Sequence, residues 1–188
     1  MSGSSRSALV LMDLQQGVVG AFGGGPEVLA AARRAIDLAR GGGVPVVYVR
    51  LAFRTGYPEV DSRNRVFARV VGGARFTDED PATQIAPSIA PEPEDIVVTK
   101  KRISAFSGSD LDYVLRSSGI DTLVMGGVAT SGVVLSTLRQ ASDLDYDAVV
   151  LRDVCADGDP EVHRVLLDKL FPRQASVMTV DEWEGGTS

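Results

Sequence analysis

The sequence is poor in the residues that build disulfide frameworks and histidine metal sites. It has one cysteine, Cys155, and one histidine, His163, among its 188 residues. A single cysteine cannot form a disulfide within the chain, and a single histidine excludes a site with several histidine ligands. We therefore expect neither a disulfide-stabilised fold nor a multi-histidine metal centre.

The sequence also lacks a long apolar run and an excess of positive charge. No apolar stretch approaches the roughly 20 residues that cross a bilayer, and the opening MSGSSRS lacks the apolar core of a signal peptide. Acidic residues outnumber basic ones by 25 to 19, whereas a general nucleic-acid binder presents a basic face to phosphates. We expect a cytoplasmic protein that binds neither nucleic acid nor membrane.

Length and composition favour one folded domain. Hydrophobic residues make up 44% of the chain and charged residues 23%, as in average globular proteins. A chain of this size buries roughly 70% of its unfolded surface on folding, which is enough for a full core. We expect a single domain over residues 1–188, with residues 1–6 and 184–188 as loose tails.

Short apolar runs alternate with helical patterns along the chain. The runs predict strands over residues 7–13, 44–51, 95–100, 121–128, 147–154 and 175–180. The intervening patterns predict a helix from Pro26 to the glycines 41–43, and helices over residues 109–117 (with Ser109 as N-cap), 130–141 and 160–170. The less regular residues 52–91, with a helical segment over 63–71, are long enough for a lid or binding loop.

This alternation predicts an α/β fold of Rossmann-like, three-layer α/β/α type, with a six-stranded, mostly parallel sheet between two layers of helices. Ligands of such sheets bind at the carboxyl ends of the strands. Asp13 ends the first strand, Lys100 ends the third, and the fourth runs into the turn of residues 127–129. An acid, a base and a backbone turn are thus candidates for one pocket. Each also has a structural interpretation, as a turn residue, a solvated basic edge and a close contact of the backbone.

Three ordered segments resemble a known family. Residues 13–16, DLQQ, resemble the D-M-Q-N segment that follows the first strand of the isochorismatase-like hydrolases, also called the cysteine hydrolase superfamily. Residues 100–106, KKRISAF, are similar to the K-x-R-x-S-A-F segment of that family, and residues 127–137 resemble its G-V-x-T-x-x-C-V-x-x-T turn. Residues 152–163 follow its closing pattern, so that the resemblance runs from about Ala8 to Val180.

The resemblance implies a fold and a set of site residues. It implies the strand order 3-2-1-4-5-6 and a cis peptide between Val128 and Ala129. It implies that Asp13 and Lys100 are catalytic. The positions that it implies for contact with the substrate are Gln15, Phe106, Val128, Ala129 and Val133.

The resemblance also bears on cofactors and assembly. We expect no metal and no cofactor, because the metal-binding histidines of some relatives have no counterpart here. A small-molecule substrate and a homodimer or homotetramer are implied, in which residues 52–91 could help to close the pocket of a neighbour. Light scattering would test this assembly.

The chain departs from the family at one position. In the amidase members a cysteine at the start of the helix after strand four is the nucleophile, where the helix dipole favours a thiolate and an oxyanion. The corresponding residue here is Val133. Cys155 closes the fifth strand, about 10 Å from the first at roughly 4.8 Å per strand, and is expected to be an inert packing residue. Ser131 and Ser136 would each need a positioned base, and His163 is expected to pack or cap.

Isochorismatases also lack the cysteine, and the resemblance therefore implies cleavage of an enol ether or related bond by water. There the acid, here Asp13, protonates the vinyl carbon, and water captures the resulting oxocarbenium-like centre. Burial would raise the pKa of Asp13, whereas Lys100 would lower it. The carboxylate-binding residues of isochorismatases are not recognisable, so the substrate is left open.

Two other functions remain open at this stage. The first is a catalytically inactive family member that binds a ligand or partner, because Val133 removes a nucleophile. The second is dinucleotide binding, because residues 127–132, GVATSG, form a G-x-A-x-x-G run between a strand and a helix. That run follows the fourth strand rather than the first and has alanine for its middle glycine, which weakens this option. Equilibrium dialysis with NAD would test it.

Overall fold

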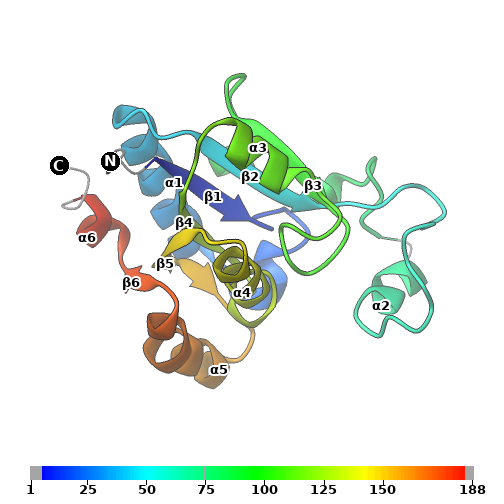
Figure 1. The fold of residues 1–188 in the computed structure, drawn as a ribbon. Coiled ribbons are helices and arrows are strands. Elements are labelled where there is room, and N and C mark those ends of the chain that lie inside the picture. Colours follow the sequence, from blue (N-terminus) through cyan, green and yellow to red (C-terminus); the bar gives the residue numbers. More distant parts are fainter. Residues whose placement is uncertain (1–5, 74, 185–188) are drawn as a thin grey trace.

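A single six-stranded sheet runs through the molecule (Figure 1). The structure is a computed structural model that describes residues 6–73 and 75–184. The strands are β1 (Ser7–Met12), β2 (Val46–Leu51), β3 (Ile96–Lys100), β4 (Thr122–Val128), β5 (Asp147–Ala156) and β6 (Ser176–Met178). They are all parallel and lie in the order β3-β2-β1-β4-β5-β6, which confirms the predicted fold class and strand order.

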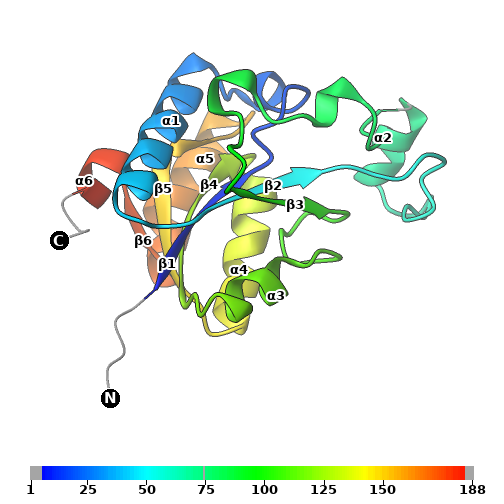
Figure 2. The ribbon, with the colours of Figure 1, turned by 90° about the horizontal axis from the view of Figure 1, so that it is seen from above.

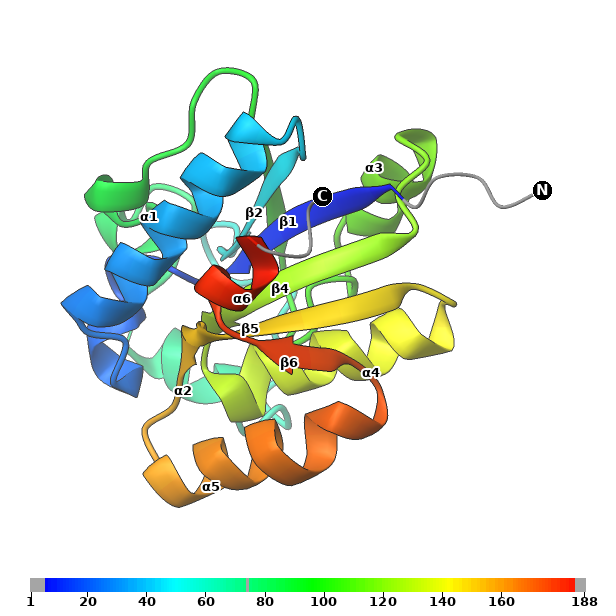
Figure 3. The same ribbon diagram turned by 90° about the vertical axis from the view of Figure 1, so that its left-hand side faces the viewer.

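Helices cover both faces of this sheet. They are α1 (Pro26–Gly41), α2 (Phe67–Gly72), α3 (Leu111–Ser117), α4 (Leu135–Asp143), α5 (Pro160–Val165) and α6 (Val180–Glu184). Helices α1 and α6 pack on one face, while α3, α4 and the turn that continues α5 pack on the other (Figure 3). Because both faces are covered, β1 and β4 consist almost entirely of buried residues, as is typical of parallel strands.

Helix α1 shows how the sequence pattern positions these layers. Pro26 is its first residue, where a missing N–H costs nothing. Its buried residues recur at helical spacing and form the stripe that meets the sheet: Val28, Ala31, Ala32, Ala35, Ile36 and Ala39. The small alanines allow the helix to lie close to the strands. No helix in the described ranges is long and apolar enough to cross a membrane.

The start of α2 and the end of β6 differ from the prediction, and a side-chain to backbone hydrogen bond lies at each of them. The Oδ1 atom of Asn64 accepts hydrogen bonds from the backbone N–H groups of Val66 and Phe67, at 3.2 and 3.1 Å, so α2 begins later than residue 63. Thr179 and Glu182 exchange side-chain to backbone hydrogen bonds at 3.2 and 2.7 Å. This capping box starts α6 and ends β6 early, at Met178.

The predicted tails are described only in part. Residues 1–5 and 185–188 lie outside the described residues. Arg6 is held in place, since its backbone N–H donates to Oδ1 of Asp121 at 3.0 Å and its guanidinium to the Ser118 carbonyl at 2.8 Å. Glu184 closes α6.

The long segment after β2 extends beyond the sheet. Leaving the carboxyl end of β2, it carries α2 away from both helical layers before it returns to β3 (Figures 1 and 2). It therefore stands at the edge of the sheet where the strands end. This is where a lid or binding loop was expected.

Candidate active site

Asp13 and Lys100 form a buried ion pair at the carboxyl end of the sheet. Asp13 directly follows β1, and Lys100 is the last residue of β3. The Nζ atom of Lys100 lies 2.9 Å from Oδ2 of Asp13, and the two side chains are 2% and 10% exposed. The backbone of Asp13 has a φ of +56°, a left-handed conformation that aspartate tolerates better than most residues. The predicted acid and base are thus brought together.

The ammonium group of Lys100 uses all three of its donors within the protein. Besides Oδ2 of Asp13, it donates to the carbonyls of Arg102 and Ile103 at 2.9 and 3.1 Å. A lysine ammonium has three N–H groups, so none remains for a further acceptor. Its position is therefore set by the protein alone.

The other carboxylate oxygen of Asp13 is in the opposite situation. Oδ1 is buried and has no hydrogen-bond partner within the described part of the chain. A buried acceptor in that state gains a partner from a bound molecule or carries a proton. Burial raises the pKa of the Asp13 carboxyl above its usual range, although the charge and hydrogen bond of Lys100 act to lower it. Asp13 is thereby suited to hold and transfer a proton.

A cavity of about 400 Å³ opens beside this pair. Asp13 and Lys100 supply its charged groups, and the turn after β4 lines it with Val128, Ala129, Ser131, Gly132 and Val133. The rest of its lining is apolar and comprises Val18, Phe22, Leu51, Val66, Phe67, Val70, Phe76 and Ile103. Four of these residues, Val66, Phe67, Val70 and Phe76, belong to the long segment predicted as a lid or binding loop, which supports that prediction.

Strand β4 lies in close contact with β1 and β5 just before the turn that follows it. A Cβ atom on Gly127 would lie 2.3 Å from the carbonyl oxygen of Met12, and one on Gly126 would lie 2.5 Å from Cγ1 of Val154. Glycine at both positions lets β4 lie against β1 and β5 at this point. The peptide between Val128 and Ala129 is cis, as the resemblance implied. The chain then enters a wide helical turn, Thr130–Val134, which places Val133 in the cavity wall.

His163 supports this turn from outside the cavity. Its Nδ1 atom lies 2.8 Å from Oγ1 of Thr130, and the same hydroxyl donates to the Ala156 carbonyl at 3.0 Å. Because that carbonyl can only accept, the hydroxyl proton points to it and the Nδ1–H of His163 donates to Thr130. Burial lowers the pKa of His163. This placement agrees with the predicted packing or capping role.

Ser131 and Ser136 show no arrangement for nucleophilic attack. The backbone N–H of Ser131 donates to Oδ2 of Asp157 at 2.7 Å, and the Ser131 side chain also hydrogen-bonds to the Asp157 carboxylate. Ser136 does not line the cavity. Burial acts to raise the pKa of Asp157, but the hydrogen bonds that it accepts hold this pKa below its usual value, so Asp157 is a weak base for the Ser131 hydroxyl.

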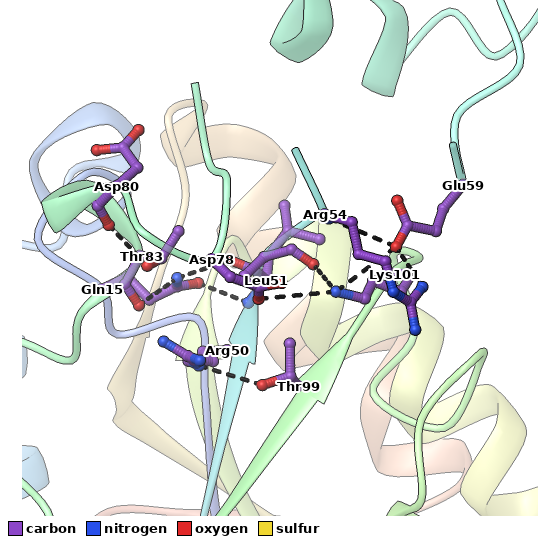
Figure 4. A network of polar contacts seen from close by, with 11 residues as sticks. Gln15, Arg50, Leu51, Arg54, Glu59, Asp78, Asp80, Thr83, Thr99 and Lys101 are labelled. Carbon is purple, nitrogen blue, oxygen red and sulfur yellow. Dashed lines mark hydrogen bonds and ion pairs between the residues drawn. The ribbon is translucent and has the colours of Figure 1, made fainter. Parts of the chain in front are cut away.

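Two of the residues implied for substrate contact lie elsewhere. The side chain of Gln15 is fully buried and bonds only to the main chain: it accepts from the Leu51 N–H at 2.8 Å and donates to the carbonyls of Leu51 and Thr83 at 2.9 and 2.8 Å. Figure 4 shows it tying the end of β2 to the long segment. Phe106 stacks on Tyr146 in the core on the α4 face, with ring centroids 5.8 Å apart. Neither residue lines the cavity, whereas Val128, Ala129 and Val133 do.

Charged groups of the long segment form a separate network beside the site (Figure 4). Lys101 donates to the Ala52 carbonyl at 2.5 Å and lies 3.9 and 3.8 Å from the carboxylates of Glu59 and Asp78. Arg54 donates to Glu59 at 2.6 Å. The network fixes the base of the segment that carries the apolar cavity wall.

Cys155 lies two strands from Asp13, as predicted. It pairs with Gly127 on β4, which in turn pairs with Met12 on β1. Its side chain is buried in the core, and this burial raises the pKa of the thiol to about 12. It does not line the cavity.

The sequence did not predict the apolar wall of the cavity, which Phe67, Val70 and Phe76 form. Phe67 and Val70 lie three residues apart, with Arg65 and Arg69 close by, which is a signal for one apolar helix face. The pattern does not say what that face covers. Among residues 6–73 and 75–184 there is no group of three or more histidine, cysteine, aspartate or glutamate side chains that could hold a metal.

Comparison with known proteins places the chain in a family. The model of the isochorismatase domain matches residues 7–182. The chain is 34% identical over 178 residues to an uncharacterised isochorismatase family protein, YwoC of Bacillus subtilis, with 95% of this chain and 92% of that protein covered. It is 30% identical over 207 residues to the ureidoacrylate amidohydrolase RutB of Stutzerimonas stutzeri, with 98% of this chain and 80% of that protein covered.

A solved structure of the same family has a similar fold. An isochorismatase family protein from Burkholderia thailandensis superposes with a TM-score of 0.83 at 28% identity, and 98% of this chain and 97% of that chain are covered. The family match covers nearly the whole chain. It includes the six strands, the buried Asp13–Lys100 pair and the turn after β4. The chain belongs to the isochorismatase family and is an isochorismatase-family hydrolase.

Proposed function

We propose that this protein hydrolyses a small metabolite through Asp13 and Lys100 with water, and not through a cysteine nucleophile. The bond that fits best is an enol ether or a related bond. One observation carries the proposal: Oδ1 of Asp13 is a buried, unpartnered carboxylate oxygen in the wall of an apolar cavity.

Asp13 acts as the acid in this mechanism. Protonated Oδ1 gives its proton to the terminal vinyl carbon of the enol ether, and the electron pair of the C=C bond forms the new C–H bond. The other vinyl carbon becomes an oxocarbenium centre, to which water adds. The proton lost by that water returns to the Asp13 carboxylate, and the hemiketal separates into a carbonyl compound and an alcohol.

Lys100 keeps the acid in position. Because its ammonium donates to Oδ2, the proton of Asp13 has its place on Oδ1, the oxygen next to the substrate. The pair also limits the cost of the carboxylate that forms after proton transfer, since the cation lies 2.9 Å away. Burial and Lys100 thus act in opposite directions on the pKa of Asp13, and burial is the larger effect.

Two observations support a mechanism without cysteine. Val133 stands at the helix start where the amidase members of the family have their nucleophile, and it presents only methyl groups to the cavity. Cys155 is buried away from the cavity with a thiol pKa of about 12, so its thiolate fraction near neutral pH is very small.

A mass-spectrometric turnover screen tests the proposal. Wild type and Asp13→Asn are incubated with isochorismate, other enol ethers, and primary and cyclic amides. Asp37→Asn is the matched control, because Asp37 is an exposed aspartate paired with Arg33 at 2.6 Å on α1. We expect product from wild type and from the control but not from Asp13→Asn. Product from Asp13→Asn at the wild-type rate would refute the role of Asp13.

A second candidate function is a family member that binds a ligand without turning it over. The observation that favours it is Val133, which leaves the cavity wall without a nucleophilic atom where the amidases have one. Under this alternative no panel member is converted, while ligands still protect the protein against thermal unfolding. Asp13-dependent turnover of any panel member would exclude it.

A further inference from the structure

The cavity is lined almost entirely by apolar side chains. Three phenylalanines and eight aliphatic residues face it, and only the Asp13–Lys100 pair carries charge among its described lining. The apolar character continues to the outside, since Phe22, Val66 and Ile103 at the rim are 41%, 53% and 36% exposed. A ligand in this space exchanges water for hydrocarbon on nearly every side.

With Asp13 ionised, the charged pair offers no donor to an anion. The carboxylate and the Lys100 ammonium then neutralise each other, and every N–H of the ammonium is already bonded within the protein. A ligand carboxylate would lie beside the Asp13 carboxylate with no free donor of Lys100 to receive it. Burying such a charge without a partner is strongly unfavourable.

The two cations that follow Lys100 in the chain are also engaged. Lys101 donates to the Ala52 carbonyl, and Arg102 donates to the carbonyls of Lys101 and Glu59 at 2.6 and 2.9 Å. Neither residue lines the cavity. A binding site for a carboxylate or phosphate needs at least one free, directed cation, and arginine is the usual choice.

Besides the exposed Ser131, the lining has one buried polar position for a ligand. Oδ1 of Asp13 is unpartnered and can accept a hydrogen bond from an N–H or O–H group when ionised, or donate one when protonated. The volume of about 400 Å³ suits a single ring with a short substituent.

We infer that the substrates of this protein are uncharged, mainly apolar small molecules with one polar group, which meets Oδ1 of Asp13, and that the cavity discriminates against carboxylates. The inference deepens the proposed function and rests on its assignment of the site. It assigns the discrimination to the apolar wall, in particular to Phe67, Val70 and Phe76.

Matched pairs of ligands test this inference by binding rather than turnover. One pair is benzamide and 4-carbamoylbenzoate, and the other is phenyl vinyl ether and 4-vinyloxybenzoate. Their dissociation constants are measured by ligand-observed NMR at neutral pH. In wild type we expect the neutral member of each pair to bind at least about tenfold more tightly than the anionic member.

A charge introduced into the wall provides the reciprocal measurement. Val70→Lys places an ammonium among the apolar side chains, and we expect it to reduce or reverse the preference for the neutral member. Val97→Lys is the matched control, because Val97 is 45% exposed on β3 and does not line the cavity. The control should keep the wild-type preference, and circular dichroism confirms that both variants are folded.

The wild-type comparison decides the inference even where a variant folds poorly. Equal or tighter binding of the carboxylates overturns it, and so does failure of both neutral ligands to bind at about 10 mM. A preference for neutral ligands without any turnover in the screen would leave the inference standing and refute the proposed hydrolysis. Asp13-dependent turnover of anionic compounds would support the proposed hydrolysis and refute the inference.

Discussion

The ammonium of Lys100 lies 2.9 Å from one carboxylate oxygen of Asp13 and leaves the other oxygen without a partner. Two residues 87 positions apart in the chain meet because β1 and β3 end at the same edge of the sheet, with β2 between them. The pair is buried, so each member depends on the other to offset the cost of removing a charge from water.

Lys100→Met should therefore destabilise the fold strongly. It leaves the Asp13 carboxylate buried without its cation, which costs about 3–5 kcal/mol of the free energy of unfolding. Urea denaturation at neutral pH measures this loss, and adding Asp13→Asn to Lys100→Met should restore part of it. The exposed pair Arg33–Asp37 is the control, since Arg33→Ala should change stability by less than about 0.5 kcal/mol. A similar cost at both sites would argue against a buried charge pair.

The pH dependence of turnover should follow Asp13. An acid catalyst works in its protonated form, and burial raises the pKa of this carboxyl above its usual range. The kcat should therefore be highest below that pKa and fall as pH rises through it. The same carboxyl binds its proton more tightly in the folded state than in the unfolded one. Its contribution to stability is thus fully present below the unfolded pKa and is lost as pH rises through the folded pKa.

Two measurements check this dependence. The pH profile of kcat is recorded with a substrate found in the screen, and the carboxyl carbon of Asp13 is titrated by NMR in the free protein. A rate that rises through the same pH range would contradict the acid role. An Asp13 carboxyl that titrates below the usual aspartate value would contradict the dominance of burial.

Cys155 should be inert toward alkylation in the native protein. Its thiol is buried and its pKa is raised to about 12, so both access and the thiolate are lacking. Mass spectrometry after iodoacetamide treatment at mildly alkaline pH should show no labelling until urea is added. Cys155→Ala should keep the wild-type kcat to within about twofold, since Cys155 does not line the cavity. Rapid native labelling, or loss of turnover in a folded Cys155→Ala protein, would make Cys155 a candidate nucleophile again.

Gln15→Ala should act on stability rather than on substrate binding. The side chain satisfies three buried main-chain groups of Leu51 and Thr83, and its loss should cost about 3 kcal/mol. Urea denaturation and hydrogen exchange at the Leu51 amide measure the effect. Gln16→Ala is the matched control, because the neighbouring Gln16 is exposed. A higher KM with unchanged stability would instead support the substrate contact that the family resemblance implied for Gln15.

Much of this fold is predictable from the sequence because its signals are local. The apolar runs of β1 and β4 are buried on both faces, and Pro26 and the glycines after residue 40 mark the ends of α1. The signal for α6 was also present, as Thr179 and Glu182 stand in the spacing of a capping box. The alternation of strand and helix led us to interpret residues 175–180, which include Thr179, as a strand.

The residues of the site also differ in how far the sequence predicts them. Asp13 and Lys100 could be predicted because strand ends meet at one edge of a parallel sheet. The wall formed by Phe67, Val70 and Phe76 could not, because it depends on how a long segment folds back over that edge. Gln15 illustrates the same limit, since its partners on β2 and the long segment are set by tertiary structure alone.

Gly127→Ala should disturb the fold and the site together. The added Cβ would lie 2.3 Å from the carbonyl oxygen of Met12 and 2.9 Å from its Cβ, both on a buried central strand that cannot move away easily. Overpacking of this kind costs about 1–3 kcal/mol, and Asp13 follows Met12 directly, so affinity for benzamide should fall as well. Gly20→Ala is the control, because its Cβ would meet no heavy atom within 4 Å. If Gly127→Ala unfolds in urea at the same concentration as the control and binds benzamide equally well, then β1 and β4 are not in the close contact that positions Asp13 beside the turn.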